Sequence, residues 1–417
     1  MTVTIERRRL DRWPGLDAVP SGSRARIAAR VARRLFTSAV ERLDVTVLVG
    51  NQVLGRGGPV AVVHRPDEFF ARLGRDQLIG FGEAYLTGAW DAEDLSGFLT
   101  VLAADVSSLV PAPLQWLRSL VVARPPREQR GARRHTRDNI AHHYDLSNDL
   151  FGVFLDPSLS YSSALFTDDP GSATRADLEA AQHRKIDRLL DEAGVGPGTR
   201  LLEIGTGWGE LAVRAARRGA TVHTVTLSVE QQRLAQDRVA AAGVAHRVDI
   251  EICDYRAVTG SYDAVVSVEM IEAVGWRYWG TYFETVDRLL RPGGRAAVQA
   301  ITMPHDRMLA TRNTHTWINK YIFPGGFLPS VRAIDEVTRT HTALRLSDRL
   351  AFGPHYAATL RLWDQAFRAA ATEVRGLGFD ETFQRMWHFY LEYSRAGFTA
   401  GYLDVHQLTF AKTGVSE

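Results

Sequence analysis

The chain has 417 residues, 45% of them hydrophobic and 24% charged, with a formal net charge of +2. This composition is typical of a globular protein, and the length allows two hydrophobic cores. No stretch approaches the ~20 apolar residues of a transmembrane helix, and the first residues lack the apolar segment of a secretory signal. We therefore expect a cytoplasmic protein. The single cysteine, Cys253, excludes an internal disulfide and a cysteine-rich metal site, and we expect no metal.

The N-terminal region is rich in arginine. Ser23 is positioned to cap a helix over residues 24–43, on which Ile27, Val31 and Leu35 fall four residues apart and share one face beside arginines. An amphipathic helix of this kind either docks on its own domain or lies on a membrane, where its cationic side suits lipid phosphates. The sequence leaves both alternatives open.

Short apolar segments at residues 44–50 and 59–64 flank the glycine-rich GRGGP and are typical of strands. We predict a small mixed α/β domain over residues 1–122, with an accessory role in lipid binding. Residues 123–137 hold two prolines and six arginines but one acid, which predicts a basic linker. Such a linker also adds ~1 kcal/mol of attraction per arginine to an anionic membrane surface.

Residues 138–417 are predicted to form one catalytic domain. From about Thr199, strands expected at TRLLEI, ATVHTVT, VDIEICD, YDAVVSVEM and GRAAVQAIT alternate with helical segments. This alternation predicts an α/β fold with a parallel sheet and helices on both faces. Beyond about Ser347 we expect helices without further strands, covering the substrate tunnel.

A glycine-rich loop follows the first of these strands. Gly205, Gly207 and Gly209 allow the backbone to turn sharply and to approach a ligand, and Glu203 ends the strand. The spacing G-x-G-x-G after an acid is the pattern of class I methyltransferases, which have a Rossmann-like fold and bind S-adenosylmethionine. Glu203 would then face the methionine amino group.

Further cofactor contacts are expected where later strands end. Thr226 and Leu227 end the second strand, Gln231 lies in the next helix, and Asp254 and Tyr255 follow VDIEICD. An acid can accept a hydrogen bond from adenine, and an aromatic ring can stack on it. A pyrophosphate-binding loop is the alternative, disfavoured because the second strand lacks the acid that usually binds a ribose diol.

Several segments resemble the cyclopropane fatty acid synthases and their mycolic acid and methylene-forming relatives. They are residues 139–148 (NIAHHYDLSN) with 161–164 (YSSA), 203–209, 226–231 (TLSVEQ) and 317–330 (WINKYIFPGGFLPS). The resemblance implies methyl transfer from S-adenosylmethionine to the double bond of an unsaturated acyl chain of a membrane phospholipid. It also implies that Tyr144 and Ser162 contact the cofactor.

The resemblance implies a base site that holds bicarbonate in the cyclopropane-forming enzymes. Glu272, Ile301 and Tyr356 match that site, whereas Ser163 stands in place of a cysteine and Gln299 in place of a histidine. Glutamine can donate a hydrogen bond but never carries positive charge, so the change weakens an anion site. Bicarbonate binding is therefore left open.

Glu269 is a further departure, because the family usually has a small residue there. A second carboxylate in an apolar pocket repels an anion unless one group is protonated. We therefore expect Glu269, with Glu272 and Tyr356, to stabilise a carbocation and to remove a proton. The alternative is that Glu269 pairs with an arginine or caps a helix.

The product depends on where the cation sits when the proton leaves. Methyl transfer to carbon 10 of an oleoyl chain leaves the cation at carbon 9, where ring closure gives cyclopropane; a prior 1,2-hydride shift gives a 10-methylene chain instead. Residues 269–275 and 299–304 resemble actinobacterial members that make 10-methylene fatty acids. We expect that product, completed by a separate reductase, with a cyclopropane synthase as the alternative.

Alternatives of other classes are a nucleic-acid methyltransferase and a non-catalytic lipid carrier. Only the basic N-terminal region favours the first, and no base-flipping motif such as Asn-Pro-Pro-Tyr accompanies the fourth predicted strand of the catalytic domain. Glu272 and Tyr356 disfavour the second. We therefore expect no nucleic-acid partner and a peripheral position on the inner face of the cell membrane, and we leave a homodimer open.

Overall fold

The computed structural model describes residue 13, residues 15–104 and residues 148–413. The arginines before residue 13, the linker at 123–137 and Tyr144 lie outside the described residues. The chain divides into two compact units. One comprises residues 1–123, 315–320 and 363–401, and the other comprises residues 124–314, 321–362 and 402–417.

The first unit thus takes two segments from the region that we expected to form one catalytic domain. Large aromatic side chains explain this difference. The ring of Trp317 lies 4.8 Å from that of Phe389, which also contacts Tyr85 at 5.1 Å and Trp90 at 6.4 Å. These side chains bury their apolar area against the helices at Leu78–Leu86 (α3) and Leu95–Ala104 (α4), which are far away in the sequence.

The first unit has a four-stranded sheet in the order β2-β1-β3-β4, with β1 and β3 parallel. The predicted mixed α/β architecture is therefore found. Its elements are α1 (Ser23–Val40), β1 (Thr46–Val49), β2 (Gln52–Leu54), β3 (Val60–Val63), α2 (Pro66–Asp76), α3 (Leu78–Leu86), β4 (Trp90–Ala92), α4 (Leu95–Ala104), α17 (Ala371–Gly376) and α18 (Glu381–Thr399). α14 (Trp317–Tyr321) and α16 (Gly353–Ala369) run across the division between the units.

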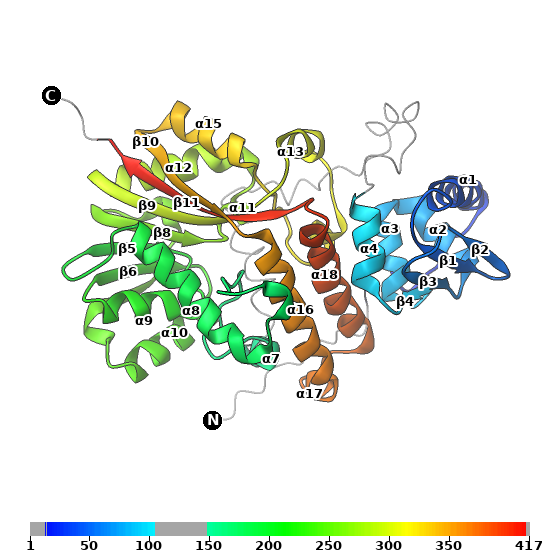
Figure 1. Cartoon of the computed structure of the whole chain (residues 1–417), viewed down its shortest axis with the longest axis horizontal. Coiled ribbons are helices and arrows are strands. Elements are labelled where there is room, and N and C mark those ends of the chain that lie inside the picture. Colours follow the sequence, from blue (N-terminus) through cyan, green and yellow to red (C-terminus); the bar gives the residue numbers. More distant parts are fainter. Residues whose placement is uncertain (1–12, 14, 105–147, 414–417) are drawn as a thin grey trace. The chain divides into compact units, whose positions relative to one another are not determined.

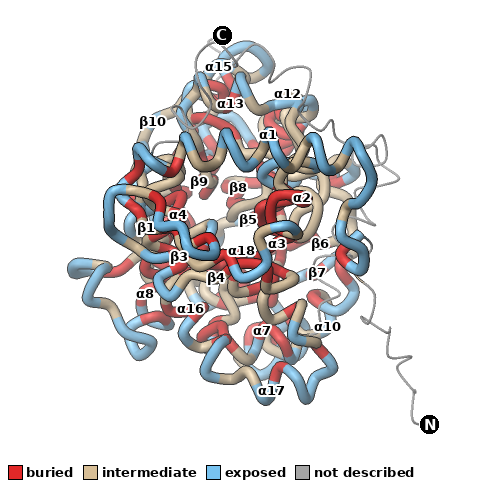
Figure 2. Tube along the Cα trace, turned by 90° about the vertical axis from the view of Figure 1, so that its right-hand side faces the viewer, coloured by how far each residue is buried: buried red, intermediate tan, exposed pale blue. Residues whose placement is uncertain are grey.

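Helix α1 turns alanines and Phe36 toward α2, whereas three of its large apolar residues face outward. A Cβ at Gly74 of α2 would lie 2.6 Å from the carbonyl carbon of Ala28, so the two helices are in close contact. Ile27, Val31 and Leu35 are 60%, 54% and 42% exposed, and Figure 2 shows the helix as exposed or intermediate until its end. The expected cap at Ser23 is wrong, because Ser23 is already helical and follows Gly22, the cap residue.

The second unit is built on a seven-stranded sheet in the order β10-β11-β9-β8-β5-β6-β7 (Figure 1). Strands β5 to β9 are parallel, and β11 is antiparallel to both β9 and β10. Their bounds are β5 (Arg200–Ile204), β6 (Thr221–Thr226), β7 (Val248–Ile252), β8 (Tyr262–Val268), β9 (Leu290–Thr302), β10 (Leu344–Ala351) and β11 (Asp404–Lys412). The expectation of helices alone beyond Ser347 is wrong, because β10 and β11 complete the sheet there.

Helices cover both faces of this sheet (Figure 1). One apolar core joins the sheet to α8 (Arg175–Glu192), α9 (Glu210–Arg217) and α10 (Val229–Ala241), and another joins it to α12 (Trp279–Leu289) and α15 (Val331–His341). The short helices are α7 (Asn148–Phe154), α11 (Ile271–Val274) and α13 (His305–Thr311). Residues 262–268 of β8 are almost wholly buried, as expected of a central parallel strand.

Within the described residues, no helix is both long enough and apolar enough to cross a bilayer.

Candidate active site

The glycine-rich loop lies between the end of β5 and the start of α9. Gly205, Gly207 and Gly209 have φ angles of 98°, 51° and 91°, a region that favours glycine. A Cβ at Gly205 would also lie 2.6 Å from Cγ of Met270. The loop conformation therefore requires glycines at the positions that the sequence assigned to the cofactor.

Glu203 is buried at the end of β5, with 3% of its surface exposed. Burial raises its pKa to about 8, and a side-chain hydrogen bond with Thr224 opposes this shift. Its Oε2 atom is buried without a hydrogen-bond partner among the described residues. A buried carboxylate oxygen of this kind requires a cation or a donor, so Glu203 fits the amino group of S-adenosylmethionine.

The end of β6 is held by local side-chain hydrogen bonds. The hydroxyl of Thr226 donates to Oε1 of Gln231 at 2.8 Å, and Ser228 caps α10 by accepting from the Gln231 N–H at 3.2 Å. Leu227, between Thr226 and Ser228 in the chain, is half-buried. Thr226, Leu227 and Gln231 thus lie together next to the glycine loop, since β5 and β6 are paired in parallel.

Asp254 and Tyr255 follow β7, the next strand of the sheet. Oδ1 of Asp254 accepts from the backbone N–H of Arg256 at 3.0 Å and from its Nε at 2.8 Å, so this carboxylate already holds an arginine. The Tyr255 ring packs edge-on against Tyr282, with centroids 5.5 Å apart, and burial raises its pKa to about 12. The adenine contact expected of these residues stays a prediction.

Glu269 directly follows β8 and has a φ of 53°, uncommon for a residue with a side chain. Its backbone N–H donates to the carbonyl oxygen of Gln299 at 2.8 Å. This bond holds Glu269 beside β9, and burial in the protein raises the pKa of its carboxyl group.

Donor groups converge on the Glu269 carboxylate from separate parts of the chain. Oε1 accepts from the Ser163 backbone N–H at 3.0 Å and from Nε2 of Gln299 at 2.8 Å, while Oε2 accepts from the Tyr356 hydroxyl at 2.7 Å. The carboxylate therefore lies among the side chains that the sequence assigned to the base site. No arginine of the described residues forms an ion pair with this carboxylate, which disfavours the alternative that Glu269 pairs with an arginine.

Glu272 lies in α11, one turn further along the chain. Its Oε1 accepts from the Ile301 backbone N–H at 2.6 Å, and its Oε2 is buried without a partner among the described residues. Burial, followed by the nearby charge of Glu269, raises the pKa of Glu272 to about 8. Near neutral pH, both effects favour the protonated form of Glu272.

Lys185 is a buried cation that the sequence analysis missed. Its Nζ donates to the Ser162 hydroxyl at 2.5 Å, and its burial lowers its pKa to about 8 while Glu269 and Asp156 oppose that shift. Ser162, expected at the cofactor, thus also anchors the segment that precedes Ser163. Its burial could have been predicted from the helical spacing, because Lys185 falls on the apolar face of α8 with Leu178, Ala181 and Leu189.

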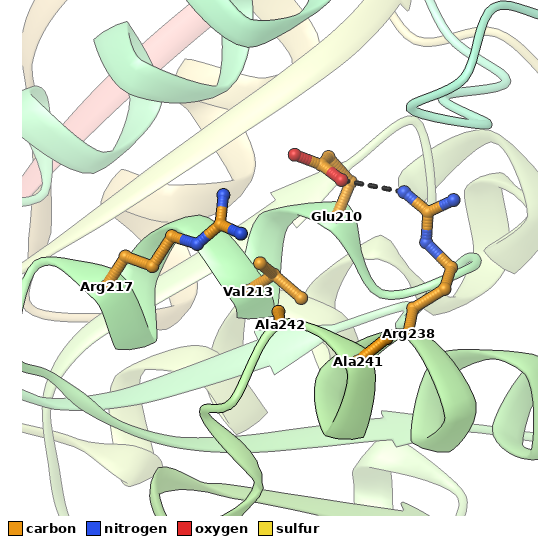
Figure 3. Close-up of a pocket in the computed structure, with 6 residues that line it drawn as sticks. All are labelled: Glu210, Val213, Arg217, Arg238, Ala241 and Ala242. Carbon is orange, nitrogen blue, oxygen red and sulfur yellow. Dashed lines mark hydrogen bonds and ion pairs between the residues drawn. The ribbon is translucent and has the colours of Figure 1, made fainter.

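A shallow depression between α9 and α10 is separate from this site (Figure 3). The side chain of Arg238 crosses it and donates to Oε2 of Glu210 at 2.7 Å. Its lining residues are Glu210, Val213, Arg217, Arg238, Ala241 and Ala242. No group of three or more histidines, cysteines and acids within the described residues is arranged to hold a metal ion.

Known proteins resemble the chain over most of its length. A family model described as mycolic acid cyclopropane synthetase matches residues 132–408. The chain is 54% identical over 410 residues to the tuberculostearic acid methyltransferase of Mycobacterium tuberculosis, covering 97% of this chain and 96% of that protein. It is 34% identical over 391 residues to the cyclopropane-fatty-acyl-phospholipid synthase of Escherichia coli, covering 91% of this chain and 97% of that protein.

Solved structures give the same assignment. A mycolic acid cyclopropane synthase complexed with SAH and CTAB is 32% identical, with a TM-score of 0.60, and covers 66% of this chain and 98% of that one. The cyclopropane synthase MmaA2 of Mycobacterium tuberculosis matches equally well, at 31% identity and a TM-score of 0.60. The expected class I methyltransferase fold and cofactor are thereby confirmed. The chain belongs to the mycolic acid cyclopropane synthetase family and is an S-adenosylmethionine-dependent methyltransferase that acts on lipid acyl chains.

Proposed function

We propose that the enzyme methylates the double bond of an oleoyl chain in a phospholipid and releases a 10-methylene chain, with Glu269 as the base. The observation that carries this proposal is the set of hydrogen bonds that Glu269 accepts from Ser163, Gln299 and Tyr356. They orient a buried carboxylate, and the nearby charge of Lys185 favours its ionised form. Such a group both stabilises a carbocation and accepts a proton from it.

The same hydrogen bonds argue against bicarbonate. A bound bicarbonate would need the donors of Ser163, Gln299 and Tyr356, which Glu269 already occupies. Glu269 would also repel a second anion in a buried space. The residues present therefore do not fit a bound bicarbonate, and the carboxylate of the Glu269 side chain takes the place of that anion.

The proposed reaction needs no reactant other than S-adenosylmethionine and the unsaturated acyl chain. S-adenosylmethionine supplies an electrophilic methyl group when it is bound. The π electrons of the alkene would form the new bond to that methyl at carbon 10 while the sulfur–methyl bond breaks and its electron pair stays on sulfur. S-adenosylhomocysteine is the leaving group, and carbon 9 is left cationic. A hydride then moves with its electron pair from carbon 10 to carbon 9, and the cation becomes tertiary. Loss of a methyl proton to Glu269 returns the C–H electrons as the double bond of the methylene group.

The relatives support this product over the cyclopropane. The tuberculostearic acid methyltransferase shares 54% of its residues with the chain, against 34% for the cyclopropane-fatty-acyl-phospholipid synthase. Tuberculostearic acid is a 10-methyl fatty acid, so a methylene chain reduced by a separate enzyme leads to it. A reductase is accordingly the partner that consumes the product.

The deciding experiment supplies the enzyme with S-adenosylmethionine and dioleoyl phospholipid vesicles. Mass spectrometry of the product lipid shows addition of one methyl carbon, and proton spectra distinguish exocyclic alkene protons from upfield cyclopropane protons. Alkene signals support the proposal, and cyclopropane signals overturn the product assignment. Transfer to free acids or thioesters but not to vesicles would overturn the phospholipid substrate.

We also propose that α1 attaches the enzyme to the anionic inner surface of the cell membrane. Ile27, Val31 and Leu35 project from its outer side, and the surface next to them is concave and formed by polar and charged residues, three of them arginines. The lining residues are Arg30, Arg33, Arg34, Thr37, Ser38, Glu41 and Gln52. Apolar residues at helical spacing among arginines match the acyl and phosphate layers of an anionic membrane.

A further inference from the structure

A chain of hydrogen-bonded side chains leads from a partly exposed arginine on α8 to the Glu269 carboxylate. Nη1 of Arg188 donates to Oε1 of Gln407 at 2.9 Å, and Nε2 of Gln407 donates to Oε1 of Gln299 at 3.1 Å. Nε2 of Gln299 then donates to Oε1 of Glu269 at 2.8 Å. Gln407 and Gln299 are 1% and 0% exposed, so water does not compete for these bonds.

The orientation of the Gln407 amide is determined at both of its ends. A guanidinium group only donates hydrogen bonds, so Gln407 must present its oxygen to Arg188. Its Nε2 also donates to the backbone carbonyl oxygen of Lys185 at 3.0 Å, and a carbonyl oxygen only accepts. The N–H groups of Gln407 are therefore directed away from Arg188 and toward Gln299.

The Gln299 amide is oriented in turn. Because Gln407 donates to it, Gln299 must present its oxygen to Gln407 and its nitrogen to Glu269. The carbonyl oxygen of Ser163, 3.4 Å from the same nitrogen, requires the same orientation. A reversed Gln299 would place its oxygen against the Glu269 carboxylate and another oxygen, which is unfavourable in a buried site.

We propose that Arg188 and Gln407 are positioning residues that hold the Gln299 N–H group toward Glu269 and so keep that carboxylate ready to accept a proton. This inference rests on the proposed role of Glu269 as the base. Arg188 is itself held in place, since its Nη2 lies 2.6 Å from Oδ2 of Asp348 and 3.4 Å from Oε1 of Glu192. Arg188 thus holds the outer end of the relay, and the backbone carbonyl oxygens of Lys185 and Ser163 favour the same hydrogen-bond directions.

Other charged and titratable groups also act on Glu269. They are Lys185 on α8, Glu272 on α11 and Tyr356 on α16. The hydrogen bonds from Gln299 and Ser163 lower the pKa of Glu269, against the larger effect of burial that raises it. Loss of the Gln299 donor therefore raises the pKa of Glu269, while the other groups stay in place.

Gln407→Glu is the sharpest test, because it preserves the shape and the Arg188 pairing but removes the N–H group. Gln299 must then reverse to donate to the new carboxylate, and its oxygen turns toward Glu269. We expect kcat at pH 7 to fall ~10-fold or more, and the acid limb of the pH profile to move up by ~1 unit. Gln407→Met removes the donor that holds the Gln299 amide in one orientation without forcing the reversed one, so the N–H toward Glu269 is lost only part of the time and we expect a smaller effect of the same sign.

Arg188→Met should also move the acid limb upward, and Arg188→Lys, which retains a donor, should restore part of the difference. The matched control is Arg214→Met. The Arg214 side chain is 22% exposed, against 24% for Arg188, and it pairs with Asp187, the residue that precedes Arg188 on α8. We expect its pH profile to match that of the wild type. Melting temperatures and affinity for S-adenosylhomocysteine, measured on every variant, identify any that have lost the fold.

Wild-type pH profiles in folded Gln407→Met and Arg188→Met variants would overturn the relay. Should Gln407→Glu fail to fold, these two variants still decide the question. Glu269→Gln separates this outcome from a failure of the proposed function. If Glu269→Gln turns over slowly and the Arg188 and Gln407 variants keep the wild-type pH profile, Glu269 remains the base and only the relay is rejected. If Glu269→Gln keeps its activity, both the relay and the role of Glu269 as base are rejected.

Discussion

The hydroxyl of Tyr356 lies 2.7 Å from Oε2 of Glu269, on the opposite side of the carboxylate from the oxygen that accepts two N–H groups. Those N–H groups occupy Oε1. A hydroxyl can both donate and accept, so Oε2 can take up a proton and keep its contact with Tyr356. Oε2 is therefore the oxygen that we expect to receive the substrate proton.

Glu269→Gln should slow turnover by ~100-fold or more, because the amide preserves the shape of the side chain but cannot accept the proton as a base. Single-turnover transfer of labelled methyl to vesicles measures the effect. Glu336→Gln is the control, since the Glu336 side chain is 54% exposed and pairs with Arg332 of the same helix, α15. Near-normal turnover of Glu269→Gln, or a rate that rises with added bicarbonate, would return the base role to an anion from solution.

Glu203 should make the cofactor-free enzyme less stable at higher pH. Its pKa in the folded state is about 8, against ~4.3 in an unfolded chain. A raised folded pKa contributes stability that is complete below the unfolded value and is lost as the pH rises through the folded value. Relative to Glu203→Gln, the free energy of unfolding should therefore fall between about pH 4.5 and 8, by up to ~1.4 kcal/mol per unit.

Urea unfolding of both proteins at pH 5 and pH 8.5 checks this expectation. Glu203→Gln should gain on the wild type at the higher pH, because the amide stays neutral. An identical difference in stability at the two pH values would show that Glu203 is solvated and does not have the raised pKa.

Cofactor binding should be lost in Glu203→Ala and in Gly205→Val. The first change removes the anion that faces the amino group, and the second places a side chain at a φ of 98° and against Met270. Calorimetry with S-adenosylhomocysteine should show at least a ~10-fold weaker affinity for each. The control is Gly196→Ala, where a Cβ meets nothing within 4 Å; unchanged affinity in both test variants would mean that the cofactor binds elsewhere.

Attachment to anionic vesicles should weaken when Ile27, Val31 and Leu35 are all changed to serine. About 0.8 kcal/mol is lost for each buried CH₂ group, so sedimentation with vesicles should decrease ~10-fold or more. Leu377→Ser, at an exposed leucine of the same unit, should have no effect. Wild-type binding by the triple variant would show that α1 does not enter the lipid surface.

Salt distinguishes the contribution of the arginines. Charge attraction is screened over ~8 Å at physiological ionic strength, so binding to anionic vesicles should fall as salt rises. Changing Arg30 and Arg34 to glutamine should reduce that salt dependence. Equal binding to neutral and anionic vesicles at low salt would contradict an electrostatic contribution and leave apolar insertion as the only attraction.

By itself, the sequence determined the parallel part of the large sheet, the glycine loop and the residue types of the base site. Buried parallel strands and amphipathic helices have local periodicities, and the φ angles of the loop require glycine. The family resemblance also grouped Ser163, Glu269, Gln299 and Tyr356 before their contacts were known. These are properties that a short segment or a motif carries wherever it lies.

Only the tertiary structure decided how the groups are paired. Strand β11 enters between β9 and β10 by pairing with segments far away in the chain, and this brings Gln407 beside Gln299. Residues 315–320 and 363–401 join the first unit through aromatic contacts of the same non-local kind. The direction of an amide, the burial of Lys185 and the protonation of Glu272 depend on neighbours that no spacing rule identifies, because hydrogen bonding and desolvation act between whatever groups the fold brings into contact.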